Sequence, residues 1–259
     1  MHATEVGDTL LLHHFDDLDQ QKNSSTLGMW AFLATEVMFF GGLFTAYALY
    51  RALYHEAFGA ASRHLYVWVG FANTLVLLTS SLTMAMAVHS AATRRKVWVV
   101  RYLLMTFALG LAFLGVKAWE WKTDYDEHLA PGINFDWNYA QSHGGGHEAS
   151  AGEASSGTEP GPGRESTETT LQPGDKMPAT TEAGRAEMFF VLYFFMTGLH
   201  ALHMVIGLAL VGLFAYLAHR NWFSGGGETQ IEMLGLYWHF VDIVWVFLYP
   251  LLYLIEVRP

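Results

Sequence analysis

The chain has 259 residues, of which 52% are hydrophobic and 15% aromatic, no cysteine, and a formal net charge of -10. This charge argues against nucleic acid as a partner, because binding phosphates draws on clustered Lys and Arg. The absence of cysteine excludes thiolate-bound copper, iron–sulfur clusters and covalently attached c-type haem within the chain. If the protein serves redox chemistry, we expect the metal centres to lie in other chains.

Five apolar stretches follow one another along the chain. A helix that spans a membrane needs about 20 mostly apolar residues, and only helices or closed barrels satisfy backbone polar groups in hydrocarbon. These stretches lack the alternating polarity of barrel strands. The sequence therefore predicts an all-α, polytopic membrane protein with five transmembrane helices. The predicted spans cover residues 27–50, 66–89, 97–119, 188–219 and 234–255.

Polar segments divide the chain into four parts around these spans. The parts are an acidic N-terminal segment at 1–26, the first three helices within 27–121, a long low-complexity insertion at 122–187, and the last two helices within 188–257. The acidic segment carries no apolar run of signal-peptide length, so we expect no cleaved targeting segment. The composition of the insertion cannot bury a core. His143 and His147 lie within it, and the Gly- and Ser-rich surroundings favour a solvated tract over a metal site.

The orientation follows from a basic cluster between the second and third spans, formed by Arg94, Arg95, Lys96 and Arg101. Connections rich in Lys and Arg face the cytoplasm. With five spans, this places the N-terminus in the cytoplasm and the C-terminus and the long insertion on the outer side.

Glu36 lies within the first predicted span, in LGMWAFLATEVMFFGGLF, with no Lys or Arg within a helical turn. An ionisable side chain near mid-membrane costs about 2.5 to 3.5 kcal/mol on insertion scales. We therefore expect Glu36 to face protein or water rather than lipid tails. Two roles stay open for this buried carboxylate: a proton-handling group, or a neutral structural acid that donates a hydrogen bond across a helix interface.

The last two predicted spans each carry a pair of polar residues. His200 and His203 are three residues apart in YFFMTGLHALHMVIG, and His239 and Asp242 have the same spacing in YWHFVDIVWVFLY. Each pair therefore shares one helical face. Imidazoles from different helices can bind haem or a metal, but hydrogen bonds across helices or lipid headgroup contacts are the commoner use. We assign no metal site and no catalytic residue.

The end of the third predicted span holds Lys117, Glu120 and Trp121 in GVKAWEW. Lys117 and Glu120 are about one helical turn apart and can pair with each other, or the lysine can reach a phospholipid phosphate. Trp121 and Trp238 lie near predicted span ends, where indole rings prefer the headgroup region. We expect all four to make polar or lipid contacts.

Taken in order, these motifs resemble subunit III of the haem-copper cytochrome c and quinol oxidases. The segments that carry the resemblance are LGMWAFLATEVMFFGGLF, KAWEW, TGLHALHMVIG and YWHFVDIVWVFLY. They fall within 27–121 and 188–257. The acidic N-terminal segment and the insertion lie outside the resemblance. Members of this family commonly have seven helices, and this chain looks like the shorter form that lacks the first two.

The resemblance implies a subunit of a proton-translocating cytochrome c oxidase, which reduces oxygen to water in the respiratory chain of a bacterial inner membrane. Such a subunit carries no haem or copper of its own, since these belong to partner subunits. It packs against the catalytic subunit I and other oxidase subunits, binds phospholipid and supports proton uptake. The insertion at 122–187 then becomes a candidate contact with a larger respiratory supercomplex.

The resemblance also covers the polar residues described above. Glu36 matches the buried membrane carboxylate of the family. Further matches are the characteristic polar positions His200, His203, His239 and Asp242, and the charged helix end at Lys117 and Glu120.

Several alternatives remain open at the level of the sequence. Within the family, the chain resembles subunit III of a quinol oxidase or the accessory protein of nitric oxide reductase. Outside it, a b-type haem between the fourth and fifth spans would make the chain an electron-transfer protein. A transporter that uses Glu36 and Asp242 is disfavoured, because no inverted repeat with paired broken helices is evident.

Overall fold

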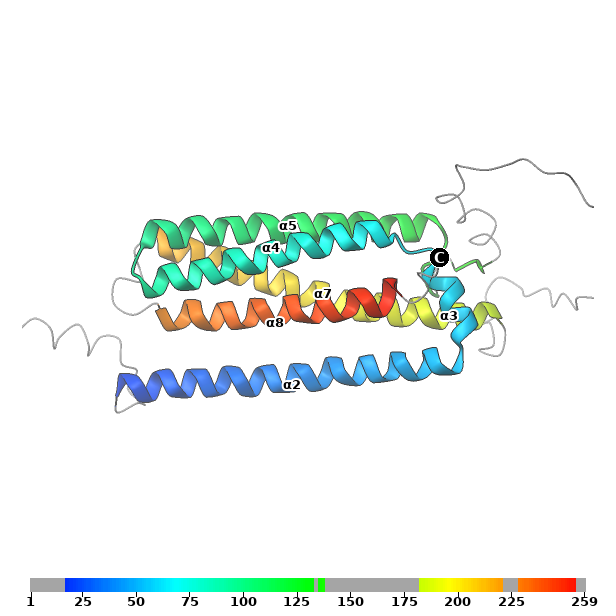
Figure 1. Cartoon of the computed structure of the whole chain (residues 1–259), viewed down its shortest axis with the longest axis horizontal. Coiled ribbons are helices and arrows are strands. Elements are labelled where there is room, and N and C mark those ends of the chain that lie inside the picture. The colour runs from blue at the N-terminus through cyan, green and yellow to red at the C-terminus, as the bar shows by residue number, and fades with distance from the viewer. Residues whose placement is uncertain (1–16, 133–134, 138–181, 221–227, 255–259) are drawn as a thin grey trace, which may run out of the picture.

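The computed structural model describes residues 17–132, 135–137, 182–220 and 228–254. Within these ranges the chain forms only helices (Figure 1). The helices are α2 (Leu18–Leu53), α3 (His55–Ser62), α4 (Val67–Ala92), α5 (Lys96–Asp126), α7 (Glu182–His219) and α8 (Glu228–Tyr253). All except α3 are long and apolar enough to cross a membrane. The predicted all-α fold with five spans is confirmed.

The helices extend beyond the predicted spans, mainly at polar ends. α5 continues from Trp119 to Asp126, and α8 begins at Glu228, six residues before the predicted start at 234. The short helix α3 was not predicted, because its eight residues HEAFGAAS carry no spanning pattern. Most of the insertion, 138–181 with His143 and His147, lies outside the described residues.

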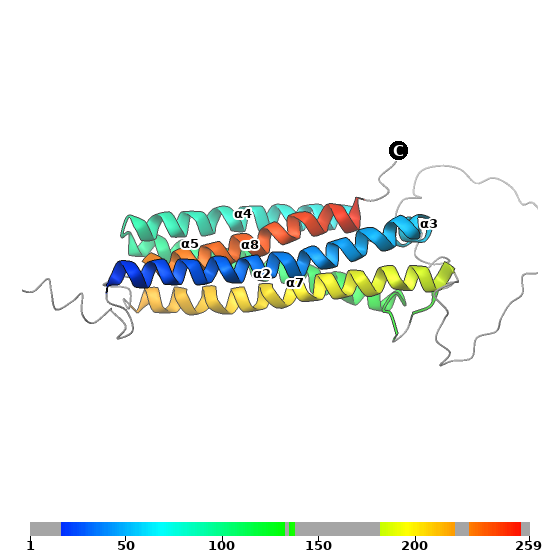
Figure 2. The same cartoon turned by 90° about the horizontal axis from the view of Figure 1, so that it is seen from below.

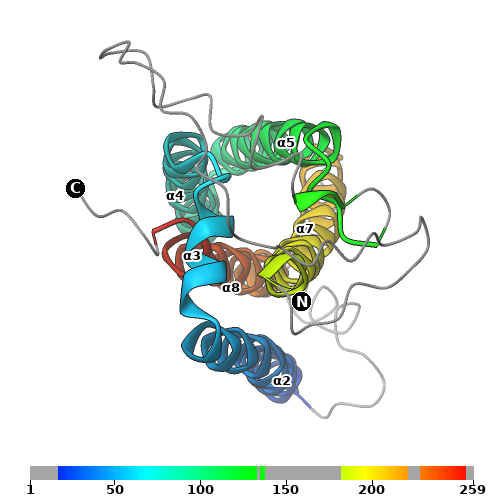
Figure 3. The ribbon, with the colours of Figure 1, turned by 90° about the vertical axis from the view of Figure 1, so that its right-hand side faces the viewer.

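Four of the long helices surround a common interior, and the fifth lies beside them. Viewed along the helices, α4, α5, α7 and α8 form a four-helix bundle, with α2 on its outside next to α8 and α7 (Figure 3). α3 crosses one end of the bundle, where α5 ends and α7 begins (Figures 1 and 2). We call this the α3 end. The connection between α4 and α5 lies at the opposite end.

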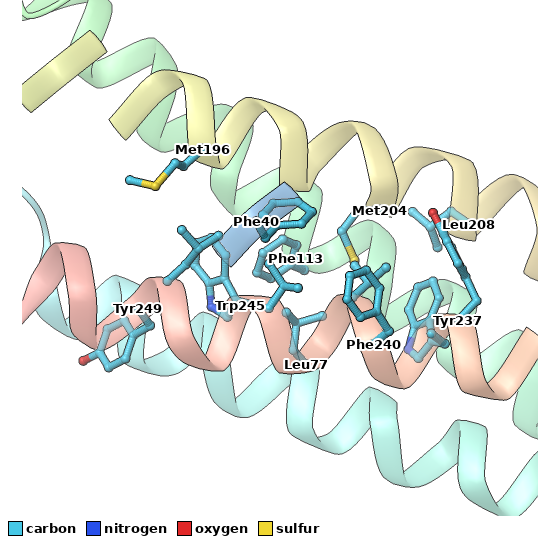
Figure 4. Packing of buried hydrophobic residues seen from close by; sticks show 14 of the residues in the cluster. Phe40, Leu77, Phe113, Met196, Met204, Leu208, Tyr237, Phe240, Trp245 and Tyr249 are labelled. Atoms are coloured by element: carbon cyan, nitrogen blue, oxygen red, sulfur yellow. The ribbon is translucent and has the colours of Figure 1, made fainter. Parts of the chain in front are cut away.

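Apolar residues cover the outside of the helices as well as the inside. Large side chains such as Trp68 and Met38 are 82% and 79% exposed, which fits helices that are apolar on all sides and face lipid. The interior is packed with aromatic rings. Phe113 and Trp245 meet edge to face at 4.9 Å between ring centroids (Figure 4), a favourable geometry for aromatic pairs.

Candidate functional site

A cluster of charged and phenolic side chains lies inside the bundle near the α3 end. Lys117, Glu120 and Asp124 come from one face of α5, and Tyr193 and Tyr253 come from α7 and α8. Spacings of three and four residues place the three charged groups on the same side of the helix. All three are nearly inaccessible, at 2%, 1% and 0% exposure. We call these five residues the Lys117 cluster.

Hydrogen bonds connect the members of the Lys117 cluster. Lys117 Nζ donates to Glu120 Oε2 at 3.0 Å, to the Tyr193 hydroxyl at 3.0 Å and to the Tyr253 hydroxyl at 2.6 Å. The Tyr253 hydroxyl donates to Glu120 Oε1 at 2.5 Å. The Tyr193 hydroxyl lies 3.2 Å from both Glu120 Oε1 and Asp124 Oδ2. The predicted Lys117–Glu120 pair is therefore present, inside the protein rather than at the lipid headgroups.

Aromatic faces complete the surroundings of the lysine. Its Nζ lies 4.9 Å from the ring centroid of Tyr193, 5.2 Å from that of Trp245 and 5.3 Å from that of Tyr253. An ammonium group over aromatic faces gains from the ring quadrupoles, most when it is desolvated. The rings thus provide part of the environment that a buried cation needs.

Sequence reasoning missed Asp124, Tyr193 and Tyr253. Asp124 falls within the segment 122–187 that the sequence indicates to be an insertion, and Tyr193 and Tyr253 lie in predicted spans where the sequence singles out neither as a site residue. The available signal was the spacing of Glu120 and Asp124, one helical turn apart on the face that carries Lys117.

Beyond the cluster, another hydrogen bond joins two titratable groups at the α3 end. The Tyr66 hydroxyl, just before α4, donates to Glu127 Oε1 at 3.2 Å. Burial first, and then the Glu127 carboxylate, raise the pKa of the Tyr66 phenol above its ordinary value. Glu127 follows the last residue of α5 and is half-buried.

Glu36 meets His203 where α2 lies against α7. The Glu36 Oε2 to His203 Nε2 distance is 3.2 Å, and the two side chains are 20% and 14% exposed. The other ring nitrogen, His203 Nδ1, lies 2.8 Å from the Leu199 carbonyl oxygen. Phe40 packs edge to face against the imidazole at 5.4 Å between centroids. Glu36 therefore faces protein, with a histidine as its partner.

His200 lies one helical turn before His203 but contacts different groups. It is 1% exposed and lies between Phe113 and Trp245, at 5.7 and 5.1 Å between ring centroids. Neither ring nitrogen of His200 has a hydrogen-bond partner among the described residues. The two histidines thus share a side of α7 without forming a common site.

His239 and Asp242 both face α4. The Ser81 hydroxyl lies 2.7 Å from His239 Nδ1, and Ser81 also lies close to the Asp242 carboxyl. Asp242 is only 3% exposed, and its oxygens form no hydrogen bond within the described parts of the chain. A buried carboxyl with so little support is best accommodated in its neutral form.

The two tryptophans singled out from the sequence differ in position. Trp121 is half-buried and packs against Phe194. Trp238 has no exposed surface, and its indole nitrogen donates to the Ser80 hydroxyl at 3.2 Å. The expectation of a headgroup contact does not hold for Trp238, because α8 begins at Glu228 and this residue lies well inside the helix.

No group of three or more His, Cys, Asp or Glu side chains that could hold a metal ion occurs among the described residues. The three histidines of α7 and α8 have separate environments: His203 contacts Glu36, His239 contacts Ser81, and His200 lies among aromatic rings.

Five apolar spanning helices with ionisable groups directed inward define a multi-pass membrane protein. A family model described as "Cytochrome c oxidase subunit III" matches residues 180–257, the part of the chain that contains α7 and α8. Over this part, the chain is similar to subunit III of the haem-copper oxidases.

Curated relatives of this family extend over most of the chain. Cytochrome c oxidase subunit 3 of Thermostichus vulcanus is 26% identical over 245 residues, covering 93% of this chain and 92% of the relative. Cytochrome bo(3) ubiquinol oxidase subunit 3 of Pseudomonas aeruginosa is 26% identical over 257 residues, covering 97% of this chain and 92% of the relative. Heme-copper oxidase subunit I+III of Aeropyrum pernix is 26% identical over 240 residues, covering 90% of this chain and 23% of the relative.

Proposed function

We propose that this chain is the non-catalytic subunit III of an aerobic cytochrome c oxidase, which reduces oxygen to water and translocates protons. Haem and copper lie in partner subunits, and subunit I is the principal neighbour. The Aeropyrum relative supports this partner, because its name assigns subunits I and III to one polypeptide. The chain stabilises subunit I and supports its proton uptake.

The observation that carries the proton-related part of this proposal is the contact between Glu36 and His203. The Leu199 carbonyl can only accept a hydrogen bond, so His203 Nδ1 must carry a hydrogen. His203 Nε2 and Glu36 Oε2 then share one further proton across 3.2 Å. Whether this proton resides on the acid or on the imidazole, the total charge of the pair is zero. The pair can therefore shift a proton between α2 and α7 without placing net charge in the membrane.

The remaining parts of the proposal concern the surroundings of the chain. The α3 end faces the periplasm of a bacterial inner membrane and the N-terminus lies in the cytoplasm, as the basic cluster at Arg94, Arg95 and Lys96 indicates. Phospholipid covers the exposed apolar faces, with Trp121 at their edge. The insertion docks a larger respiratory assembly, and its residues 138–181 lie outside the described structure.

The role of the Glu36–His203 pair is tested by the substitution Glu36→Gln in the assembled oxidase. The glutamine amide can still donate to His203 Nε2, so the complex should assemble normally. We expect slower proton uptake by subunit I and faster inactivation during turnover. The matched control is Glu56→Gln, an exposed acid on α3, which should change neither rate. Unchanged rates in Glu36→Gln would exclude a titrating role for this residue.

A quinol oxidase is the second candidate, because the Pseudomonas aeruginosa relative, named as a ubiquinol oxidase subunit, is as similar as the cytochrome c oxidase relative. Purifying the intact complex through this chain separates the two. Oxygen consumption with reduced cytochrome c supports the first candidate, and consumption with ubiquinol alone supports the second. Mass and absorption analysis of the same sample identifies the partner subunits and their haems.

A further inference from the structure

The Lys117 cluster contains one cation and two carboxyl groups with almost no exposed surface. If both carboxyl groups were ionised, the cluster would hold a net charge of -1 inside the membrane. A buried charge without a counter-charge is strongly disfavoured, and such a group usually becomes neutral instead. The charges balance if one carboxyl group carries a proton.

The lysine is the member with the clearest protonation state. An ammonium group has three donors and no acceptor, and Lys117 Nζ has three oxygen atoms within 3.0 Å. Because the two tyrosine hydroxyls accept from the lysine, their own hydrogens are available for the carboxyl groups. This arrangement matches a protonated Lys117.

Glu120 has the contacts of an ionised carboxylate. Its Oε2 accepts from Lys117 at 3.0 Å, and its Oε1 accepts from Tyr253 at 2.5 Å. Tyr193 can supply a further bond to Oε1 at 3.2 Å. Several charge-assisted hydrogen bonds stabilise the negative form.

Asp124 has the opposite environment. Its Oδ2 lies 3.2 Å from the Tyr193 hydroxyl, and its Oδ1 has no hydrogen-bond partner among the described residues. The single hydrogen of Tyr193 cannot serve Glu120 and Asp124 fully at once. If Asp124 is a neutral acid, it donates to the Tyr193 oxygen, Tyr193 donates to Glu120, and both bonds are satisfied.

We propose that the Lys117 cluster is a binding site for one exchangeable proton, held on Asp124 and reached from the α3 end of the bundle through Glu127. Nothing in this assignment depends on the role given to Glu36. The site's ligand is a proton from the aqueous phase, and binding it completes both the charge balance and the hydrogen-bond chain from Asp124 through Tyr193 to Glu120.

The position of Glu127 provides the route. It follows Asp124 by three residues at the end of α5, is half-buried, and accepts a hydrogen bond from Tyr66. Asp124 and Glu127 both lie near Tyr66. The titratable groups around Asp124 are Lys117, Glu120 and Glu127 on or next to α5, Tyr66 before α4, Tyr193 on α7 and Tyr253 on α8.

Infrared spectroscopy of the purified full chain tests the site, because a protonated carboxylic acid has a C=O stretch that a carboxylate lacks. We expect the wild-type chain at neutral pH to show a stronger protonated-acid band than Asp124→Asn, in which neutral acids such as Asp242 still contribute. The asparagine amide can donate to Tyr193 in place of the acid, so the fold should persist. The control is Asp126→Asn, an exposed acid on the same helix, which should keep the band. An identical band in Asp124→Asn overturns the proposal.

The route has its own readout in the same experiment. On transfer to deuterium oxide, the Asp124 band should shift as the proton exchanges, and Glu127→Gln should slow this shift without removing the band. Equal exchange rates in the two chains would overturn the route through Glu127.

A second measurement covers the case in which Asp124→Asn folds poorly. In a chain with ¹³C-labelled aspartate and the substitution Asp242→Asn, which removes the other aspartate that is buried among the described residues, a protonated band at the ¹³C-shifted position supports the site. Absence of that band overturns it.

Discussion

The four-helix bundle and α2 differ in how they are held. In an apolar 18-residue stretch of α8, 61% of the residues are buried inside the chain. In the corresponding stretch of α2, 11% are buried. The bundle interior contains the Lys117 cluster and a dense set of aromatic rings. α2 contacts the rest of the chain through fewer residues, which meet α3, α7 and α8. Examples are Glu36 with His203, Phe40 with Phe240, and Tyr47 with Phe58.

This difference reflects the forces that act between helices in a membrane. Lipid tails are as apolar as the helices, so association depends on close packing and on polar contacts rather than on apolar burial. The bundle has both in quantity, and α2 has few of each. Changes inside the bundle should therefore lower the stability of the whole chain, while changes at α2 should loosen α2 alone.

The largest effect is expected for Lys117→Met, which removes the cation of the Lys117 cluster. Because Asp124 is neutral, Glu120 then remains as a buried charge without a counter-charge, and breaking a buried ion pair costs about 3 to 5 kcal/mol. We expect a loss of this order in the free energy of unfolding, measured by denaturant titration of the chain in detergent. If Glu120 takes up a proton in this variant, the buried charge disappears, and the loss in free energy of unfolding should stay at about 3 kcal/mol.

The control for this substitution is Lys122→Met on the same helix. Lys122 is exposed, so its removal should change the free energy of unfolding by less than about 0.5 kcal/mol. Equal losses in the two variants would contradict a charge-compensating role for Lys117.

A smaller effect is expected for Gly110→Ala in the middle of α5. A Cβ atom at this position would lie 2.7 Å from Leu208 Cδ2 and 2.9 Å from Trp238 Cη2. Overpacking of this kind costs about 1 to 3 kcal/mol. Gly115→Ala is the matched control, because a Cβ atom there meets nothing within 4 Å. If thermal unfolding shows the two variants to be equally stable, the side chains of Leu208 and Trp238 can shift to make room without cost.

The five spans could be predicted from the sequence because composition and length alone define a spanning helix. The helix ends could not, since charged residues continue a helix once it leaves the apolar layer. Trp238 illustrates the consequence: a start at 234 places it near a span end, whereas the observed start at Glu228 places it inside the bundle. The short α3 depends on tertiary packing of Phe58 against Phe189, which no local pattern indicates.

Within the candidate site, the contacts between residues on the same helix could be predicted from their spacing. The contacts between residues far apart in the sequence could not. The pair Lys117 and Glu120 follows from their separation along α5. The tyrosines that complete the cluster are 76 and 136 residues from Lys117, so only the packing of α5, α7 and α8 brings them together. Similarly, Glu36 was recognised as a buried acid, but its partner His203 lies 167 residues away.

The smallest effect is expected for Glu36→Ala, which removes the polar contact between α2 and α7. Interhelical polar contacts in membranes contribute on average about 0.6 kcal/mol and at most about 1.7 kcal/mol. The stability of the bundle should therefore stay nearly constant, while backbone amides of α2 exchange hydrogen faster than in the wild type. Hydrogen exchange measured by mass spectrometry resolves the two regions, and Thr35→Ala, an exposed neighbour bonded only within α2, is the control.

Faster exchange throughout α8 as well would mean that α2 and the bundle open as one unit. Unchanged exchange in α2 would mean that its aromatic contacts alone hold it.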